Sequence, residues 1–165
     1  MTPLTLLAAQ KLAAWLINGD ALQGQIEAIA APLNVTVPPI TSVQVLLSAA
    51  TPAIGDNNLQ FSYPRICIYP GALKNTLIEK FRSFSGTVDL VAEIWASGDL
   101  VTEIDQWIHF YVQGIGVILQ NNRGDWGDGM FYAGQYDVQF QTPKAGGLGF
   151  VESAKLTMSL NVSVS

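Results

Sequence analysis

The chain has 165 residues, enough for one domain, and 13% of them are charged, against about 25% in a usual soluble domain. This low charge favours a subunit of a larger assembly. The formal net charge of −5 and the eight Lys and Arg residues exclude a basic nucleic-acid-binding face, although DNA could slide past such an acidic surface without binding. The single cysteine, Cys67, excludes an internal disulfide and a cysteine-based zinc site.

The first thirty residues predict two helices. Thr2 and Pro3 suit the cap and the first position of a helix, and Asn18-Gly19 ends it because glycine accepts the left-handed conformation. A weaker helical pattern covers residues 22–30. The first segment is amphipathic and Lys11 interrupts its apolar run, so we expect neither a signal peptide nor a membrane anchor.

Residues 32–64 are poor in charge and rich in Pro, Asn and small residues. Residues 34–40, NVTVPPI, predict a short extended piece that the proline pair ends. Residues 42–49, SVQVLLSA, suit a strand or a helix equally well. Residues 50–64 predict a loop whose length is uncommon in a compact domain unless it is functional, so it is a candidate for partner contacts.

After Pro64 the pattern becomes that of a sheet. Residues 65–69 predict a short strand, and residues 75–81 and 87–96 predict a strand pair joined by the turn RSFSG. In residues 87–96 apolar side chains alternate with polar ones such as Asp89 and Glu93, which places the two kinds on opposite faces.

Residues 99–120 predict a long helix. It has an apolar stripe, and its opposite face carries glutamines and His109. Asp99 suits the positive end of the helix dipole. Gly114 and Gly116 each weaken a helix by about 1 kcal/mol relative to alanine, which predicts close packing of this helix against the sheet.

Residues 130–141 and 150–164 predict two strands with one apolar face, joined by the loop TPKAGGLG. The expected fold is therefore α+β, with an antiparallel or mixed sheet of about four to five strands, an N-terminal helix and a long helix packed on one face. We expect a single domain over 1–165, in which 1–62 hold the helix and loop-rich region and 63–165 the sheet-helix core.

Candidate chemistry is sparse. His109 is the only histidine and no Gly-x-Ser-x-Gly motif is present, so a multi-histidine metal site and a serine-hydrolase elbow are not expected. The pair Asp125 and Asp128 lies in a glycine-rich turn and the pair Glu103 and Asp105 at a helix start, and both have ordinary structural explanations. We expect no enzyme, catalytic residue, cofactor or metal.

Four segments together resemble the tail terminator, or tail-completion, proteins of long-tailed bacteriophages. They occur in the order and at the spacing found in that family, and the resemblance covers about 100 of the 165 residues. The segments are YPRICIY, EKFRSFSGTVDLVAEI, NNRGDWGDGMFYAGQYDVQF and GFVESAKLTMSLNVSVS.

The resemblance implies a small α+β subunit of a virion, made in the host cytoplasm. Such subunits form a ring, generally a hexamer, that caps the tail tube, ends its elongation and offers a surface for joining the tail to the head. The implied partners are copies of the chain itself, the tail tube protein and the head-tail connector, or neck, protein. DNA passes through the ring without specific binding.

Six charged residues and one tryptophan in loops are the candidates for subunit or tail-tube contacts. They are Lys80, Arg82, Arg123, Asp125, Trp126, Asp128 and Lys144. For residues 123–129 two interpretations stay open: Arg123 and Asp125 cap the long helix while Trp126 fills the edge of the core, or these residues meet a neighbouring subunit with Trp126 as the anchor. The alternative functions are another neck or tail-tube protein and, more distantly, a small hydrolase or sugar-binding module.

Overall fold

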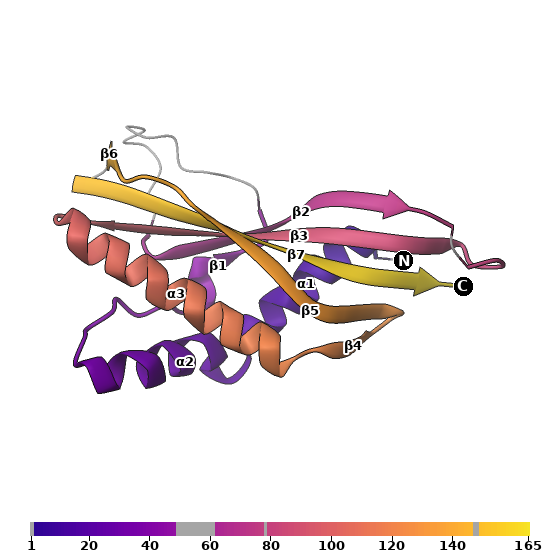
Figure 1. Cartoon of the computed structure of the whole chain (residues 1–165), viewed down its shortest axis with the longest axis horizontal. Helices are drawn as coiled ribbons and strands as arrows, with labels where there is room; N and C mark the ends of the chain where they lie inside the picture. Colours follow the sequence, from indigo (N-terminus) through magenta and orange to yellow (C-terminus); the bar gives the residue numbers. More distant parts are fainter. Residues whose placement is uncertain (1, 49–61, 78, 147–148) are drawn as a thin grey trace.

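The computed structural model describes residues 2–48, 62–77, 79–146 and 149–165. It has an α+β fold in which the helices α1 (Leu4–Ile17), α2 (Ala21–Ala30) and α3 (Val101–Asn121) accompany a long twisted sheet (Figure 1). Three short 3-10 helices lie in the N-terminal region. They are η1 (Asn18–Asp20), η2 (Ala31–Leu33) and η3 (Ser42–Gln44).

The sheet has seven strands in the described residues, more than the four to five expected. Their order is β1-β2-β3-β7-β5-β4, with β6 also paired to β7, and every pairing is antiparallel except β1 with β2. The short strands β1, β4 and β6 account for the difference, because two to four residues are too few to show an alternating pattern. The strands are β1 (Val45–Leu46), β2 (Arg65–Asn75), β3 (Phe84–Gly98), β4 (Gly124–Gly127), β5 (Met130–Phe140), β6 (Lys144–Gly146) and β7 (Gly149–Val164).

The predicted strand over residues 75–81 is wrong. β2 continues through Pro70 to Asn75, and residues 76–83 form its connection to β3. A register shift between Pro70 and Ala72 lets the proline stay inside the strand. Among the described residues β1 pairs with β2 only at Ile66 and Cys67, so no described strand lies along this edge at Pro70, which suits a residue without an N–H.

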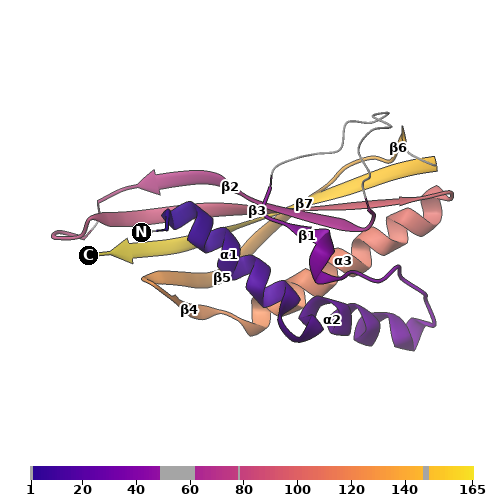
Figure 2. The same ribbon diagram turned by 180° about the vertical axis from the view of Figure 1, so that it is seen from behind.

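The helices pack on one face of the sheet, as the apolar alternation predicts (Figure 2). Alternate residues of β3 and β7, among them Val88 opposite Leu160 and Ala92 opposite Leu156, are fully buried beneath them. The two helix glycines have different neighbours. A Cβ on Gly116 would meet the Tyr136 hydroxyl of β5, but one on Gly114 would meet α2, so the expectation that both pack against the sheet is wrong for Gly114.

Helix boundaries follow the sequence signals to within a few residues. Gly19, at φ 62°, ends α1 in the left-handed conformation that the sequence predicts. The residues that precede α1 and α3 are Pro3 and Leu100, so Thr2 and Asp99 each lie one residue outside the expected cap.

The segment between α2 and β1 is mostly irregular. Residues 35–40 belong to no helix or strand. Residues 42–46 combine the 3-10 helix η3 with the strand β1, so the helix and the strand interpretation of SVQVLLSA each hold for a part of it. The buried hydroxyl of Tyr111 fixes this segment to α3 by donating a hydrogen bond to the Pro38 carbonyl at 2.7 Å. Most of the predicted contact loop over residues 50–64, and residues 147–148 of TPKAGGLG, lie outside the described residues.

None of the helices in the described ranges is long and apolar enough to span a membrane.

Candidate functional site

The predicted contact residues fall in three places. Lys80 and Arg82 lie in the β2–β3 connection, Arg123 to Asp128 lie at the β4–β5 hairpin, and Lys144 begins β6 at the opposite end of the sheet (Figure 1). Arg82 and Asp128 border the same surface hollow. The structure therefore brings members of the first two groups together and separates Lys144 from both.

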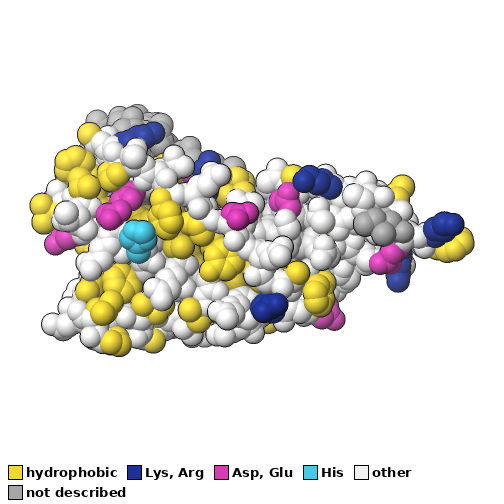
Figure 3. Space-filling view, viewed as in Figure 1, with side chains coloured by type: hydrophobic (Ala, Val, Ile, Leu, Met, Phe, Trp, Pro, Cys, Tyr) yellow, Lys and Arg dark blue, Asp and Glu magenta, His cyan; other side chains and the backbone are white. Residues whose placement is uncertain are grey.

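The β2–β3 connection projects from the sheet, and we call its described residues, 76–77 and 79–83, the finger. Phe81 is 100% exposed there, and Leu77 is 61% exposed. Both have positive φ, 67° and 47°, a conformation that is strained for bulky side chains. Figure 3 shows Lys and Arg side chains beside hydrophobic atoms at this tip. Leaving a phenylalanine in water gives up about 2–3 kcal/mol of burial, so the exposed ring indicates a contact surface.

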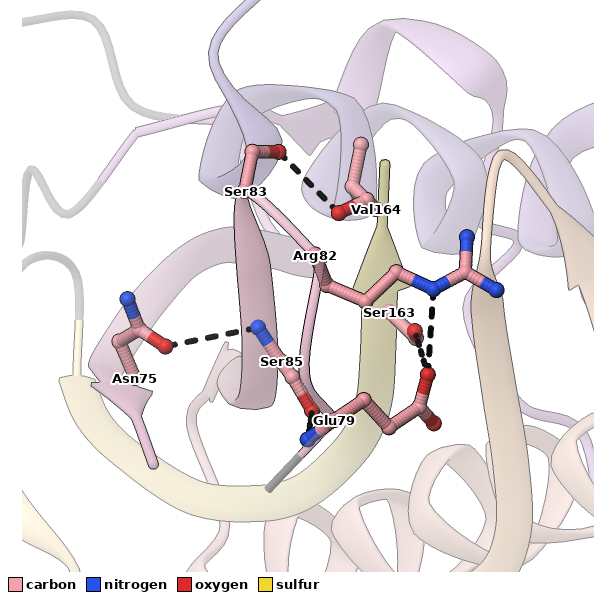
Figure 4. Close-up of polar contacts among 7 residues, drawn as sticks. All are labelled: Asn75, Glu79, Arg82, Ser83, Ser85, Ser163 and Val164. Carbon is pink, nitrogen blue, oxygen red and sulfur yellow. Dashed lines mark hydrogen bonds and ion pairs between the residues drawn. The ribbon is translucent and has the colours of Figure 1, made fainter. Parts of the chain in front are cut away.

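Polar contacts fix the finger to the C-terminal strand (Figure 4). The Glu79 carboxylate accepts hydrogen bonds from Ser163 Oγ at 2.8 Å and from Arg82 Nε at 3.2 Å. Ser83 donates from its backbone N–H and its hydroxyl to the Val164 carbonyl, at 2.9 and 3.1 Å. The bonds to Ser163 and Val164 join residues about eighty positions apart, so the finger has a defined position on the sheet.

A second set of bonds closes the finger on its other side. The backbone N–H groups of Thr76 and Leu77 both donate to the Ser85 carbonyl at 2.9 Å. Ser85 Oγ accepts from the Glu79 N–H at 3.4 Å, and Asn75 Oδ1 accepts from the Ser85 N–H at the same distance. This bonding offsets part of the strain at the two residues with positive φ.

Beside the finger lies an open hollow of about 960 Å³ that α1, the β4–β5 turn and the end of β7 border. Asp128 is held there by an ion pair with Lys11 at 2.8 Å. Lys11 Nζ also donates to the Trp126 carbonyl at 2.8 Å, so the turn is tied to α1. The hollow is lined by Thr2, Pro3, Leu4, Leu7, Arg82, Ser83, Asp128, Gly129, Ser163, Val164 and Ser165.

Trp126 belongs to the core of its own chain. It is 6% exposed, its indole N–H donates to the Asn122 carbonyl at 2.7 Å, and its ring lies 5.6 Å from that of Tyr132 and 6.3 Å from that of Trp15. The ring therefore fills the edge of the core, as in the first of the two interpretations, and its contact with a neighbouring subunit stays a prediction. A side chain already buried has little surface left for a partner.

The flanking residues have local roles that differ from helix capping. Asp125 Oδ1 accepts the Gly127 N–H at 2.8 Å, which is an Asx turn inside the β4–β5 hairpin. The exposed Arg123 side chain lies over Gly134 of β5, where an added Cβ would come within 2.3 Å of Arg123 Nε. The end of α3 is capped instead by Asn122, whose Nδ2 donates to the Ile118 carbonyl at 2.8 Å.

Sequence analysis missed Phe81, although it named the residues on either side. The available signal was an aromatic residue between Lys80 and Arg82 in a polar turn. Its wrong assignment to a strand gave the phenylalanine an ordinary structural explanation and hid this signal.

His109 is exposed on α3, as its polar face predicts. Its Nε2 lies 3.9 Å from Asp105, and its ring lies 4.9 Å from that of Phe140. In the described ranges no group of three or more His, Cys, Asp or Glu side chains is arranged to hold a metal ion.

Glu152 on β7 is a buried carboxyl group near α3. It is 3% exposed, and burial, followed by the charge of Asp105 and a hydrogen bond with it, raises the pKa of Glu152 from about 4.5 to about 7. Between these two pH values the folded protein keeps a proton that the unfolded chain has released. Stability is therefore present at low pH and falls as the pH rises through this window.

Replacement of Glu152 by glutamine should remove this pH dependence. We expect E152Q to raise the free energy of unfolding at pH 8 by about 1–3 kcal/mol and to change it little at pH 4.5, because glutamine mimics the protonated group. Urea unfolding at the two pH values measures the effect. E103Q, at an exposed position on α3, is the control, and an equal pH dependence in E152Q and the unmodified protein would contradict the assignment.

Comparison with protein-family models gives no match for this chain, and comparison with curated proteins gives none either.

Proposed function

We propose that this chain is a structural, non-enzymatic subunit of a phage virion that forms a ring on the tail tube, ends tube elongation and provides the surface for head-tail joining. The observation that carries the proposal is the finger, which holds a fully exposed Phe81 between Lys80 and Arg82 in a position fixed by polar contacts. Aromatic and arginine side chains of this kind are typical anchors of protein interfaces.

The composition and the resemblance support the same proposal. A chain with 13% charged residues and a formal charge of −5 suits contacts with other subunits and a channel that DNA crosses without binding. The four segments that resemble tail terminators include residues of the finger, the β4–β5 hairpin and β7. These three elements border the hollow beside the finger.

The test is to mix purified protein with tail tubes assembled without it and to image them by negative-stain electron microscopy. Rings at one end of tubes of fixed length would support the proposal. Decoration along the tube, or tubes formed by the protein itself, would place the chain among tube proteins instead. No association with tubes would contradict a tail role.

The finger gives this test a matched pair of variants. We expect F81S to reduce the fraction of capped tube ends at least tenfold, because it removes the exposed anchor, while the free energy of unfolding stays within about 0.5 kcal/mol of the original. L33S is the control, since Leu33 is 64% exposed at the end of η2, away from the finger. Full capping by F81S would show that the finger does not carry the contact.

A further inference from the structure

The outer face of the sheet, opposite the helices, carries a second hollow of about 640 Å³. β5 separates from β7 there: Tyr132 pairs with Leu160 and Tyr136 with Met158, so the three residues 133–135 face one residue of β7. Gly134 adopts φ 106° in this bulge. The hollow is lined by Asp89, Ala133, Gly134, Gln135, Tyr136, Asp137, Thr157, Ser159 and Asn161.

The charged groups that line this hollow are acidic. Asp89 accepts a short hydrogen bond from Ser159 Oγ and lies 3.9 Å from the exposed Lys74. Asp137 is exposed, and within the described residues it forms no ion pair. The remaining lining consists of hydroxyl and amide side chains and the residues of the bulge, whereas the Tyr136 ring points to the helix face, toward Gly116 of α3. Such a surface suits a cationic group.

The finger carries the complementary groups. Lys80 is exposed and forms no ion pair in the part of the chain that the structure describes. Arg82 is 44% exposed and contacts Glu79 through one nitrogen, which leaves its other donors available. Between them, Phe81 is fully exposed. In a chain of formal charge −5, this cationic tip is attracted to the acidic surface of another copy.

The two aspartates of the outer-face hollow lie far from the finger tip of their own chain. Glu79 of the finger bonds Ser163, two residues from Asn161 at the near edge of the hollow, but Asp89 lies five residues beyond Phe84 along β3. At about 3.3 Å per residue this separation is about 17 Å along an extended strand. A contact of Lys80 and Arg82 with Asp89 and Asp137 therefore joins two copies.

We propose that the finger of one copy enters the outer-face hollow of the next copy, with Lys80 and Arg82 facing Asp137 and Asp89 and Phe81 between them. This inference rests on the proposed ring function and names the contact that would close the ring. The two surfaces are different parts of the molecule, so the contact is heterologous, and its repetition produces a closed ring or an open filament instead of a two-fold dimer.

A charge exchange tests the pairing. K80E and D137K each reverse a charge that has no ion-pair partner in the described chain, so folding should be unaffected, and E27K at an exposed position of α2 is the control. We expect each of K80E and D137K to lose most tube capping and the K80E/D137K double variant to recover it. Undiminished capping by the single variants, or no recovery in the double variant, would overturn the pairing.

Disulfide trapping tests the geometry without tubes. The native Cys67 is fully buried, so thiols introduced as K80C and Q135C, the latter on β5 at the exposed side of the hollow, are the ones open to oxidation. The chain with both changes should give a ladder of covalent multimers, and a mixture of the two single variants should stop at dimers. Dimers from K80C alone, indicating contact between two fingers, or no trapping in the double variant would contradict the inference.

The two tests separate this inference from the proposed function. Covalent ladders together with unmodified protein that fails to cap tubes would retain the contact and reject the terminator role. Capping by unmodified protein without ladders or charge recovery would retain the role and reject the contact.

Discussion

Replacement of Trp126 by alanine should lower the free energy of unfolding by about 3–5 kcal/mol. The change removes a ring that is 6% exposed, its packing on Tyr132 and Trp15, and the hydrogen bond that it donates to Asn122. The cavity would open between α1 and the β4–β5 hairpin, where neither element can easily move because Lys11 ties them together. Urea unfolding followed by far-ultraviolet circular dichroism avoids the loss of a fluorescent residue.

Two variants separate the parts of this effect. W126F keeps most of the ring but leaves the Asn122 carbonyl without its donor, and it should cost less than W126A. W15A removes a ring that is 39% exposed, so its cost should be smaller than that of W126A as well. A loss below about 1 kcal/mol in W126A would show that Trp126 is not part of the core and would reopen its role as an interface anchor.

Replacement of Gly86 by alanine should cost about 3 kcal/mol or more. Gly86 lies opposite Asn75 in the β2–β3 pairing, and an added Cβ would come within 1.8 Å of the Lys74 carbonyl oxygen. The obstacle is backbone, so relief requires the two strands to separate at the base of the finger. We expect a lower urea midpoint and faster amide hydrogen exchange at residues 73–77.

Gly24 provides the matched control for Gly86. It lies inside α2 with no atom within 4 Å of an added Cβ, so G24A should raise stability by about 0.5–1 kcal/mol through helix propensity alone. Opposite signs for the two glycine-to-alanine changes would support the strand register around the finger. A neutral G86A would contradict that register.

The wrong prediction of a strand over residues 75–81 shows a limit of local sequence patterns. Pro70 and Gly71 predict the end of a strand, and the apolar residues that follow predict the start of another. In the fold, β2 runs past the proline with a register shift against β3 and with no described strand on its outer edge there, and this depends on which strand lies beside it. The neighbour of a strand is set by the whole chain, so no window of the sequence contains it.

Burial on the sheet face opposite the helices also depends on which elements lie beside each strand. Alternation predicts Asp89 and Glu93 on a polar face, and both do lie opposite the helices. Yet Glu93 is 3% exposed and accepts a hydrogen bond from Tyr69 at 2.9 Å, whereas Asp89 borders an open hollow. A period of two residues separates the faces of a strand but does not say what covers each position along it.

The sequence by itself determined the α+β class, the helix over α3 and the long strands β3 and β7, because each has enough residues to repeat its period. It also indicated the charged turns as contact candidates. Only the tertiary structure decided that Arg82 and Asp128 border one hollow, that Lys144 lies apart from them, and that Phe81 is exposed while Trp126 is buried. Those outcomes depend on strand register and on contacts between residues far apart in the chain, which turn sequences without a period do not encode.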